Sequence, residues 1–356
     1  MRLATYNAAL TRKGPGLLLK DIVERDRQVV AVARIIKTVR PDVLLLNEFD
    51  HDFENRALAE FMALLREDDG ALKGIDYPYS FAPPQNVGLR SGLDLDGDGE
   101  LNGGGDAFGF GTFRGQYAMA LLSRLPIGAG AVDLATLRWA DFPGAKMPRN
   151  PDGTPFPTAQ AAEVMRLSSK GHWAVPVQRR GGQRLWIVAA HPTPPVFDGP
   201  EDRNGLRNAD EIRLLAAMIE GTAPGTAGLV DEPVVVMGDL NADPNDGDGV
   251  RDAIAGLLTH PRLQDPLPGS AGAVEAAEQQ GGANELHRGD PALDTTDWRD
   301  NRGPGNLRVD YVLPSKELRV TGSGVFWPAQ DHPDAGLLGS GRRRTSDHFL
   351  VWVDIE

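Results

Sequence analysis

Residues 234–241 read VVVMGDLN, an apolar run of strand-forming residues that leads directly into an acidic turn. β-Branched residues such as the three valines favour a buried strand. Side chains two residues apart in a strand lie on the same side, so we expect Asp239 and Asn241 to point the same way from the strand end. A carboxylate and an amide would then converge on one point.

Other short apolar segments bounded by turn residues predict further buried strands at residues 3–6, 43–46, 119–122, 185–189, 309–313 and 349–353. Apolar residues at helical spacing predict helices at residues 26–38 and 208–219. This order of elements indicates two sheets packed face to face with helices outside. We therefore expect an α/β (α+β) fold, a four-layer sandwich of two packed, mixed and mostly antiparallel β-sheets flanked by helices.

The length of the chain, 356 residues, is one that mixed sandwiches often reach as a single unit. Its 42 Gly and 27 Pro indicate many turns and long loops. We expect one domain over residues 1–356, with long inserted loops at about residues 88–111, 139–160 and 269–302. No apolar run reaches the length of a membrane span, and strand-like residues begin right after Met1, so we expect no transmembrane segment and no signal peptide in this chain.

The formal net charge of −13 opposes nonspecific binding of nucleic acid, which needs a basic surface. Clustered carboxylates fit divalent cations, which offset their repulsion of a phosphate substrate. The chain contains no cysteine, which excludes disulfides, thiolate catalysis and zinc sites built on sulfur but leaves the compartment open. We favour a secreted or periplasmic location and expect a monomer. Residues 342–344 are all arginine and predict an exposed basic turn.

Polar residues that can bind metal or phosphate end several of the predicted strands. Asn7 ends the first strand, and Glu48 ends the second apolar run. A carboxylate at such a buried end needs a cation or hydrogen bonds to offset its charge. Similar positions, at or next to a predicted strand, are taken by His191, Asp310, Asp347 and His348.

Seven short segments resemble the motifs of the endonuclease/exonuclease/phosphatase superfamily, which includes pancreatic-type deoxyribonuclease, abasic-site endonucleases, inositol polyphosphate 5-phosphatases and neutral sphingomyelinases. They read ATYN at residues 4–7, LNE at 46–48, ALLSRLPI at 120–127, AH at 190–191, GDLN at 238–241, VDYVL at 309–313 and SDH at 346–348. The resemblance covers most of the chain. It implies in-line attack of an activated water on a phosphate ester.

The resemblance also implies that Glu48 binds a catalytic divalent metal, with Asp347 and Asn7 completing or supporting the metal shell. We expect Mg²⁺, with Mn²⁺ or Ca²⁺ as alternatives. Hydrolysis of a phosphate ester needs its oxygens to be neutralised, and a divalent cation does this. The substrate we favour is a small or lipid-linked phosphomonoester or phosphodiester.

Catalytic roles follow from the same resemblance. Asp239 would orient or deprotonate the attacking water. Asn241 and His191 would bind phosphate oxygens. His348, paired with Asp310, would donate hydrogen bonds to the phosphoryl group as negative charge builds up. An Asp that accepts from one imidazole nitrogen raises the basicity of the other, so this pairing is chemically reasonable.

The substrate side of the site departs from the pancreatic-type nucleases. In those enzymes a Glu just before the counterpart of strand 119–122 partners the first histidine, whereas residues 113–117 here read FRGQY. The segment HPTPP at residues 191–195 is also stiffer than the usual His-Leu pattern. A metal-dependent nuclease is therefore the alternative function and not the favoured one. Candidate substrate contacts, each with a solvent-facing or packing role as alternative, are Arg114, Tyr117, Lys170 and His172.

A second metal site is predicted where residues 94–102 read DLDGDGELN. Oxygen ligands at alternate positions with a glycine at the tight turn are typical of a calcium loop, although a solvated turn is the alternative. The twelfth position is Gly105 and not a bidentate Glu, while Asp106 follows. A calcium-dependent binding module without turnover is thus a third reading of the chain. The candidate calcium ligands are Asp94, Asp96, Asp98 and Glu100, and a weaker acidic cluster is formed by Asp243, Asp246 and Asp248.

Overall fold

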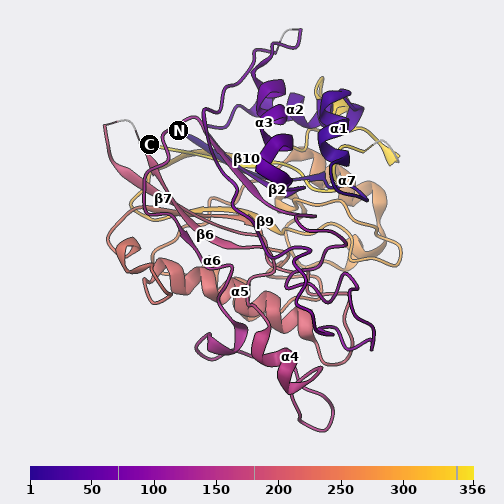
Figure 1. Cartoon of the computed structure of the whole chain (residues 1–356). Coiled ribbons are helices and arrows are strands. Elements are labelled where there is room, and N and C mark those ends of the chain that lie inside the picture. The colour runs from indigo at the N-terminus through magenta and orange to yellow at the C-terminus, as the bar shows by residue number, and fades with distance from the viewer. Residues whose placement is uncertain (71, 180, 342–343) are drawn as a thin grey trace.

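The computed structural model describes residues 1–70, 72–179, 181–341 and 344–356, so most of the predicted basic turn at 342–344 lies outside the described residues. Within these ranges the chain forms two β-sheets (Figure 1). The six-stranded sheet has the order β10 (Val320–Val325), β11 (Val351–Ile355), β1 (Arg2–Leu10), β2 (Val43–Phe49), β4 (Ala120–Ser123) and β3 (Tyr79–Phe81). The five-stranded sheet has the order β5 (Val132–Asp133), β6 (His172–Gln178), β7 (Arg184–Ala190), β8 (Val234–Asp239) and β9 (Asp310–Pro314).

Each sheet contains one parallel pair of strands, and the other pairs are antiparallel, which confirms the predicted mixed character. β1 runs parallel to β2, with Leu3 opposite Val43. β7 runs parallel to β8, with Trp186 opposite Val234. Parallel neighbours end at the same edge of a sheet, so the polar residues at the carboxyl ends of these four strands are gathered in pairs.

An apolar core fills the space between the two sheets, to which β1 and β2 contribute Leu3 and Leu45 and β8 contributes Val235 and Met237. The outer face of the six-stranded sheet is covered by α1 (Leu17–Val23), α2 (Arg27–Val39) and α3 (Arg56–Arg66). The outer face of the five-stranded sheet is covered by α5 (Arg203–Ile219) and α6 (Arg251–Leu258). Figure 1 shows these two sets of helices at the top and bottom of the molecule. The predicted four-layer sandwich is confirmed.

The helices that cover the sheets are amphipathic, as the spacing of their apolar residues predicts. Asp26 caps the N-terminus of α2 because its side chain accepts a hydrogen bond from the backbone N–H of Gln28 at 2.9 Å. The apolar residues of α2 form one face, which packs against the sheet. The residues that α2 buries at spacings of three and four are Val29, Val32, Ala33 and Ile36.

Four of the described strands, β3, β5, β6 and β10, were not predicted from the sequence. β3 and β5 are two or three residues long and partly exposed, so they carry little apolar signal. β6 contains Pro176, and β10 contains two glycines, residue types that are rare inside strands. The predicted strands at 309–313 and 349–353 begin one and two residues too early.

The predicted loops are correct only in part. Residues 269–302 contain α7 (Ala271–Gln280), whose N-terminus is capped by Ser270 through a bond from the N–H of Ala273 at 3.2 Å. The alanine-rich sequence of α7 has weak apolar periodicity, which explains why it reads as a loop. The loop at 139–160 overlaps the start of α4 (Ala159–Val164), while residues 88–111 form no helix or strand of the described chain. None of the described helices has the length and hydrophobicity needed to cross a membrane.

Candidate active site

The predicted catalytic residues meet at the edge where β1, β2, β7 and β8 end. The amide of Asn7, in the second half of β1, donates a hydrogen bond to Oδ2 of Asp239, at the end of β8, at 2.9 Å. This bond joins the six-stranded sheet to the five-stranded sheet. Ser346 Oγ donates to the carbonyl of Asn7 at 2.8 Å and so ties the segment that carries His348 to the same place.

Asp239 lies at the centre of the site and is almost fully buried. Its Oδ1 accepts a hydrogen bond from the backbone N–H of Asn241 at 3.0 Å, and Asn241 itself turns the chain with φ 51°. The side chain of Asn241 donates to the carbonyl of Pro192 at 3.1 Å, next to His191. Burial raises the pKa of Asp239 to about 6, against the opposing charge of His348.

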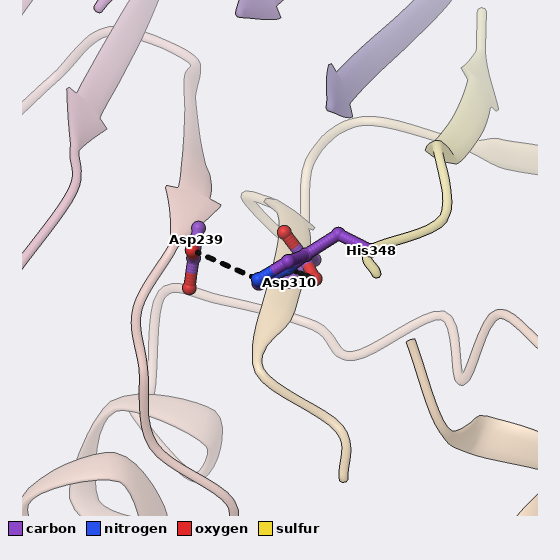
Figure 2. A group of neighbouring side chains, drawn as sticks. All are labelled: Asp239, Asp310 and His348. Carbon is purple, nitrogen blue, oxygen red and sulfur yellow. Dashed lines mark hydrogen bonds and ion pairs between the residues drawn. The ribbon is translucent and has the colours of Figure 1, made fainter. Parts of the chain in front are cut away.

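His348 forms a hydrogen-bonded pair with Asp310 (Figure 2), whose Oδ2 lies 2.9 Å from Nδ1 of the imidazole. Oδ2 of Asp310 also accepts a bond from Thr295 Oγ at 2.8 Å. Nε2 of His348 faces Asp239 at 3.7 Å. Burial lowers the pKa of His348, but the charges of Asp310 and Asp239 outweigh burial and hold that pKa well above its usual value. The imidazole is therefore a charged donor at neutral pH.

His191, which follows β7, lies on the other side of Asp239. Its Nε2 is 3.4 Å from Oδ2 of Asp239, and its buried Nδ1 has no hydrogen-bond partner among the described residues. Burial, with the charges of Lys170 and His348, lowers the pKa of His191 well below its usual value. This histidine is neutral at physiological pH. Its unpartnered Nδ1 agrees with the missing Glu noted in the sequence.

The residues predicted to hold a metal surround the same centre. Glu48 has φ 55°, which turns its side chain out of β2. Burial raises the pKa of Glu48, and the neighbouring charges of Asp347 and Asp239 raise it further against the opposing effect of His348. Asp347 is exposed, and its Oδ2 accepts a bond from the indole N–H of Trp298 at 3.1 Å. Like charges that face one another at a half-buried point fit a divalent cation, which removes their repulsion.

The tightest group of metal-binding side chains at this place is different from the predicted set. Asp239, Asp310 and His348 each offer a ligand atom within 4.8 Å of the others. Asp310 Oδ2 is already engaged by His348 and Thr295, so we interpret this group as a hydrogen-bonded network. The side-chain NH2 group of Asn7 donates to Asp239, and the side-chain oxygen of Asn7 accepts from the backbone N–H of Ala9 at 3.2 Å.

A cavity of about 1530 Å³ opens over the site. Tyr117 and Lys170, predicted as substrate contacts, both line it. The ammonium of Lys170 is almost fully buried, and burial lowers its pKa although Glu211, Asp239 and Glu48 oppose that shift. Lys170 thus lies close enough to the catalytic carboxylates for their charges to act on its pKa.

Two predicted substrate contacts lie elsewhere, which corrects the sequence analysis. His172 is fully buried in β6. Its Nε2 donates to the carbonyl of Glu211 at 2.9 Å, and its Nδ1 accepts from Ser168 Oγ at 2.7 Å, so neither ring nitrogen is left for a substrate. Arg114 is exposed and does not line the cavity. Its charge acts on His51.

Several residues that shape the site were missed by sequence reasoning. Glu211 of α5 is fully buried and accepts bonds from the N–H of Ser169 at 2.6 Å and from the N–H of Thr193 at 2.7 Å. It therefore holds the two segments that carry Lys170 and His191. Its position inside an amphipathic helix was the only signal, because a carboxylate on an apolar face needs buried partners.

The predicted calcium loop is placed along one wall of the cavity, but with changed ligands. Asp94, Asp96 and Asp106 offer carboxylate oxygens within 4.8 Å of one another. Asp98 and Glu100 are exposed and do not belong to this group, because the carboxylate of Asp98 turns back to accept from the N–H of Glu100 at 2.7 Å. Asp106 takes their place and also accepts from two backbone N–H groups of the loop.

Comparisons with known proteins identify the family and the fold of the chain. A family model described as "Endonuclease/Exonuclease/phosphatase family" matches residues 4–348. No curated protein matches the chain. Among solved structures, an endonuclease/exonuclease/phosphatase from Beutenbergia cavernae DSM 12333 is 17% identical, with a TM-score of 0.55, over 100% of this chain and 71% of that one. Sphingomyelinase C from Streptomyces griseocarneus is 17% identical, with a TM-score of 0.51, over 99% and 98%.

A third structure is the beta toxin from Staphylococcus aureus with bound magnesium ions, which is 13% identical, with a TM-score of 0.50, over 100% of this chain and 99% of that one. Identities this low establish a shared fold and leave the substrate open. The family model covers nearly the whole chain and includes every motif quoted from the sequence. The chain belongs to the endonuclease/exonuclease/phosphatase family.

Proposed function

We propose that this chain is a metal-dependent phosphoesterase that hydrolyses a small or lipid-linked phosphomonoester or phosphodiester by in-line attack of water. The observation that carries the proposal is the buried group of Asp239, His348 and Asp310, which is joined to Asn7 across the two sheets. In this group Nε2 of His348 faces Oδ2 of Asp239 at 3.7 Å, which supports the roles of charged donor and proton acceptor that we propose for them. Membership of a family of phosphoester hydrolases supports the same reaction class.

Asp239 is the residue that receives the proton from the attacking water. Its pKa of about 6, raised by burial, is close to the pH at which the enzyme would work, and general bases are most effective in that range. Asn7 and the N–H of Asn241 each donate to one of its oxygens and fix its orientation. The carboxylate therefore needs no rearrangement before the reaction.

His348 stabilises the negative charge that builds up on the phosphoryl oxygens. Asp310 keeps its imidazole charged and oriented, so a donor is already in place when the charge develops. His191 is neutral, and its unpartnered Nδ1 and its Nε2 leave it free to bind a phosphate oxygen without adding a second charge. Lys170 supplies a further positive charge beside Asp239.

The metal that we propose is Mg²⁺, held by Glu48 and Asp347 with the support of Asn7. When bound, it would neutralise phosphate charge that the carboxylates otherwise repel. The negative charges of Asp347 and Asp239 both raise the pKa of Glu48. The bound magnesium of the beta toxin structure supports this choice of metal.

The test is a panel of 4-nitrophenyl phosphate, bis(4-nitrophenyl) phosphate and plasmid DNA, assayed with Mg²⁺, Mn²⁺, Ca²⁺ or EDTA. We expect hydrolysis of at least one ester with Mg²⁺ and none with EDTA. Glu48→Gln and Asp239→Asn should each reduce kcat by about 100-fold or more. The exposed Asp331→Asn, outside the cavity, is the matched control and should change kcat less than twofold. Equal activity of wild type, Glu48→Gln and Asp239→Asn on every substrate would exclude the proposal.

Two other functions are separated by the same panel. A nuclease would cut plasmid DNA in a chelator-sensitive manner and leave both dyes intact. A calcium-dependent binding module would hydrolyse nothing, yet calcium would raise its melting temperature through Asp94, Asp96 and Asp106, the group with matching oxygen spacing. The catalytic group argues against the binding module, and the missing Glu among residues 113–117 argues against the nuclease.

A further inference from the structure

One wall of the active-site cavity carries three arginines, two of which contact Phe108. The guanidinium of Arg166 lies 4.2 Å above the Phe108 ring, and Nη2 of Arg207 donates to the Phe108 carbonyl at 2.5 Å. Arg203 and Arg207 are four residues apart on α5 and therefore lie on the same face of that helix. All three line the cavity.

No carboxylate oxygen of the described residues lies within 4.0 Å of the nitrogens of these three arginines. Their bonds are to uncharged acceptors: Arg166 donates to the side-chain oxygen of Asn86 at 2.6 Å, and Arg203 donates to the carbonyl of Leu95 at 2.6 Å. Nε of Arg203 is buried without any partner. Burial and the charge of Arg203 lower the pKa of Arg207 to about 10, against the opposing charge of Glu211, which forms no ion pair with it. The cluster thus has spare donors and a charge that is not offset by an ion pair.

Carboxylates also line this part of the cavity, but they have other partners. Asp96 attracts Arg203 and belongs to the acidic group with Asp94 and Asp106. Asp198 accepts from the backbone N–H of Asn204, at the start of α5. These contacts leave the spare donors of the arginines to a ligand.

The cluster is connected to the reaction centre by α5 itself. Arg203, Arg207 and Glu211 follow one another at intervals of four residues, about 6 Å per step along a helix. Glu211 holds the segments of Lys170 and His191 beside Asp239. Lys170 feels the charges of both Asp239 and Arg207. The arginine cluster therefore lies on the same wall as the catalytic carboxylates, roughly 10 Å from them.

We propose that Arg166, Arg203 and Arg207 form a subsite for a second phosphate group, so that the preferred substrate carries a phosphate besides the one that is hydrolysed. Guanidinium groups bind phosphate through paired N–H donors in one plane, and three of them on one wall of a cavity offer a site for a dianion. This inference rests on the proposed phosphoesterase function. The second phosphate could come from a small bisphosphorylated molecule or from the next nucleotide of a nucleic acid.

The test compares 1,6-hexanediol bisphosphate with hexyl phosphate, which differ only in the second phosphate. We expect the wild type to have a KM about tenfold lower for the bisphosphate. Arg203→Gln and Arg166→Gln should raise that KM about tenfold and leave the KM for hexyl phosphate within about twofold. Arg207 also bonds to the carbonyls of Leu167 and Arg166, so its replacement is not used. Arg56→Gln, an exposed change on α3 with no ion pair, is the control.

Equal KM values for the two substrates, or an equal rise of both in Arg203→Gln and Arg166→Gln, would overturn the subsite while hydrolysis itself upholds the phosphoesterase. If nothing is hydrolysed, calorimetric binding of the bisphosphate to the wild type that is lost in Arg203→Gln supports the subsite alone, and no binding overturns it. Oligothymidylate identifies the source: an arginine effect on oligothymidylate cleavage that exceeds the effect on the bisphosphate supports a subsite for a neighbouring nucleotide.

Discussion

Two histidines at one catalytic centre are held in opposite charge states by their surroundings. His348 faces two carboxylates, Asp310 and Asp239, whose charges outweigh burial. His191 is as deeply buried, but the charges of Lys170 and His348 lower its pKa as burial does, so burial and charge act in the same direction. A pair of groups with pKa values moved apart in this way can provide a charged donor and a neutral ligand within one small site.

The partner of His348 is the residue that this division depends on. Asp310→Asn removes the charge that keeps the imidazole protonated, so we expect kcat to fall about tenfold to a hundredfold. Thr295→Val removes only the hydroxyl that donates to Asp310 and should lower kcat less. Steady-state kinetics on the best substrate of the panel measures both, with circular dichroism as the check on folding. A larger loss in Thr295→Val than in Asp310→Asn would contradict this assignment.

The residues of the centre could be predicted because they are tied to local patterns. Asp239 and Asn241 end an apolar strand, and their spacing puts both on one side. Thr295 and Glu211 could not be found in this way. Thr295 lies in a segment without periodicity, and Glu211 is recognisable only when the segments it bonds to, at Ser169 and Thr193, are known to be adjacent.

At the scale of elements, the close contact of β7 with β8 places His191 next to Asp239. Gly238 allows it: a Cβ at this position would lie 1.9 Å from the carbonyl oxygen of Ala190. No side chain fits there without separating the two strands. The glycine of the GDLN motif is therefore required by the sheet, independently of the chemistry of its neighbours.

Gly238→Ala should destabilise the fold by about 1–3 kcal/mol, the usual cost of inserting a methyl group into a packed interior. It should also lower kcat, since the ends of β7 and β8 carry two catalytic residues. Gly256→Ala is the matched control, because its Cβ would meet nothing within 4 Å inside α6. That change should stabilise the helix by about 0.5–1 kcal/mol. Urea unfolding measures both, and equal stabilities of the two variants would refute the steric explanation.

α5 joins two parts of the site through one buried carboxylate. In Glu211→Gln an NH2 group replaces one of the two accepting carboxylate oxygens. The NH2 group cannot accept from an N–H, so a backbone donor at Ser169 or Thr193 loses its partner. Such a loss costs about 1–3 kcal/mol of stability. We also expect kcat/KM to fall, because Lys170 and His191 are carried by the released segments. Glu220→Gln, at the exposed end of the same helix, is the control and should leave kcat/KM within about twofold.

The elements differ in how well their patterns revealed them. Strands buried on both faces, such as β2 and β8, consist of continuous apolar runs, and both were predicted with the correct first residue although they end two or three residues later than predicted. β6 was missed because His172 and Pro176 interrupt its pattern, and α7 was missed because alanines dominate it. In both cases the partner across the interface, and not the local sequence, decides the structure.

On the scale of the whole molecule, the active site lies at the end of the sandwich where strands of both sheets terminate, so no single sheet contains it. Asn7, Glu48 and His348 come with the six-stranded sheet, while Asp239 and Asp310 come with the five-stranded sheet. Local sequence patterns cannot reveal such a meeting, and the family resemblance was the information that suggested it. Packing of the apolar core between the sheets is thus what sets the catalytic distances.

Part of the net charge of −13 is carried by four aspartates that lie near one another beside the cavity and repel one another. Asp294 is 7% exposed, and its carboxylate has no hydrogen bond to the described residues. Burial, and then the charges of Asp243, Asp246 and Asp290, raise its pKa from 3.8 to about 8. Folding therefore favours the protonated form of this group. The stability that it contributes is complete below about pH 4 and is lost as the pH rises through about 8.

Asp294→Asn keeps the shape of the side chain and removes this titration. In EDTA-containing buffers we expect the variant to be more stable than the wild type at pH 9, by about 1 kcal/mol or more, and close to it at pH 4. The measurement is the free energy of unfolding in urea at several pH values, with the exposed Asp331→Asn as control. A wild type whose stability relative to Asp294→Asn does not change between pH 4 and pH 9 would mean that the four aspartates do not repel one another. Because Asp243 and Asp246 line the cavity, relief of this repulsion also predicts that the rim of the active site is most rigid at low pH.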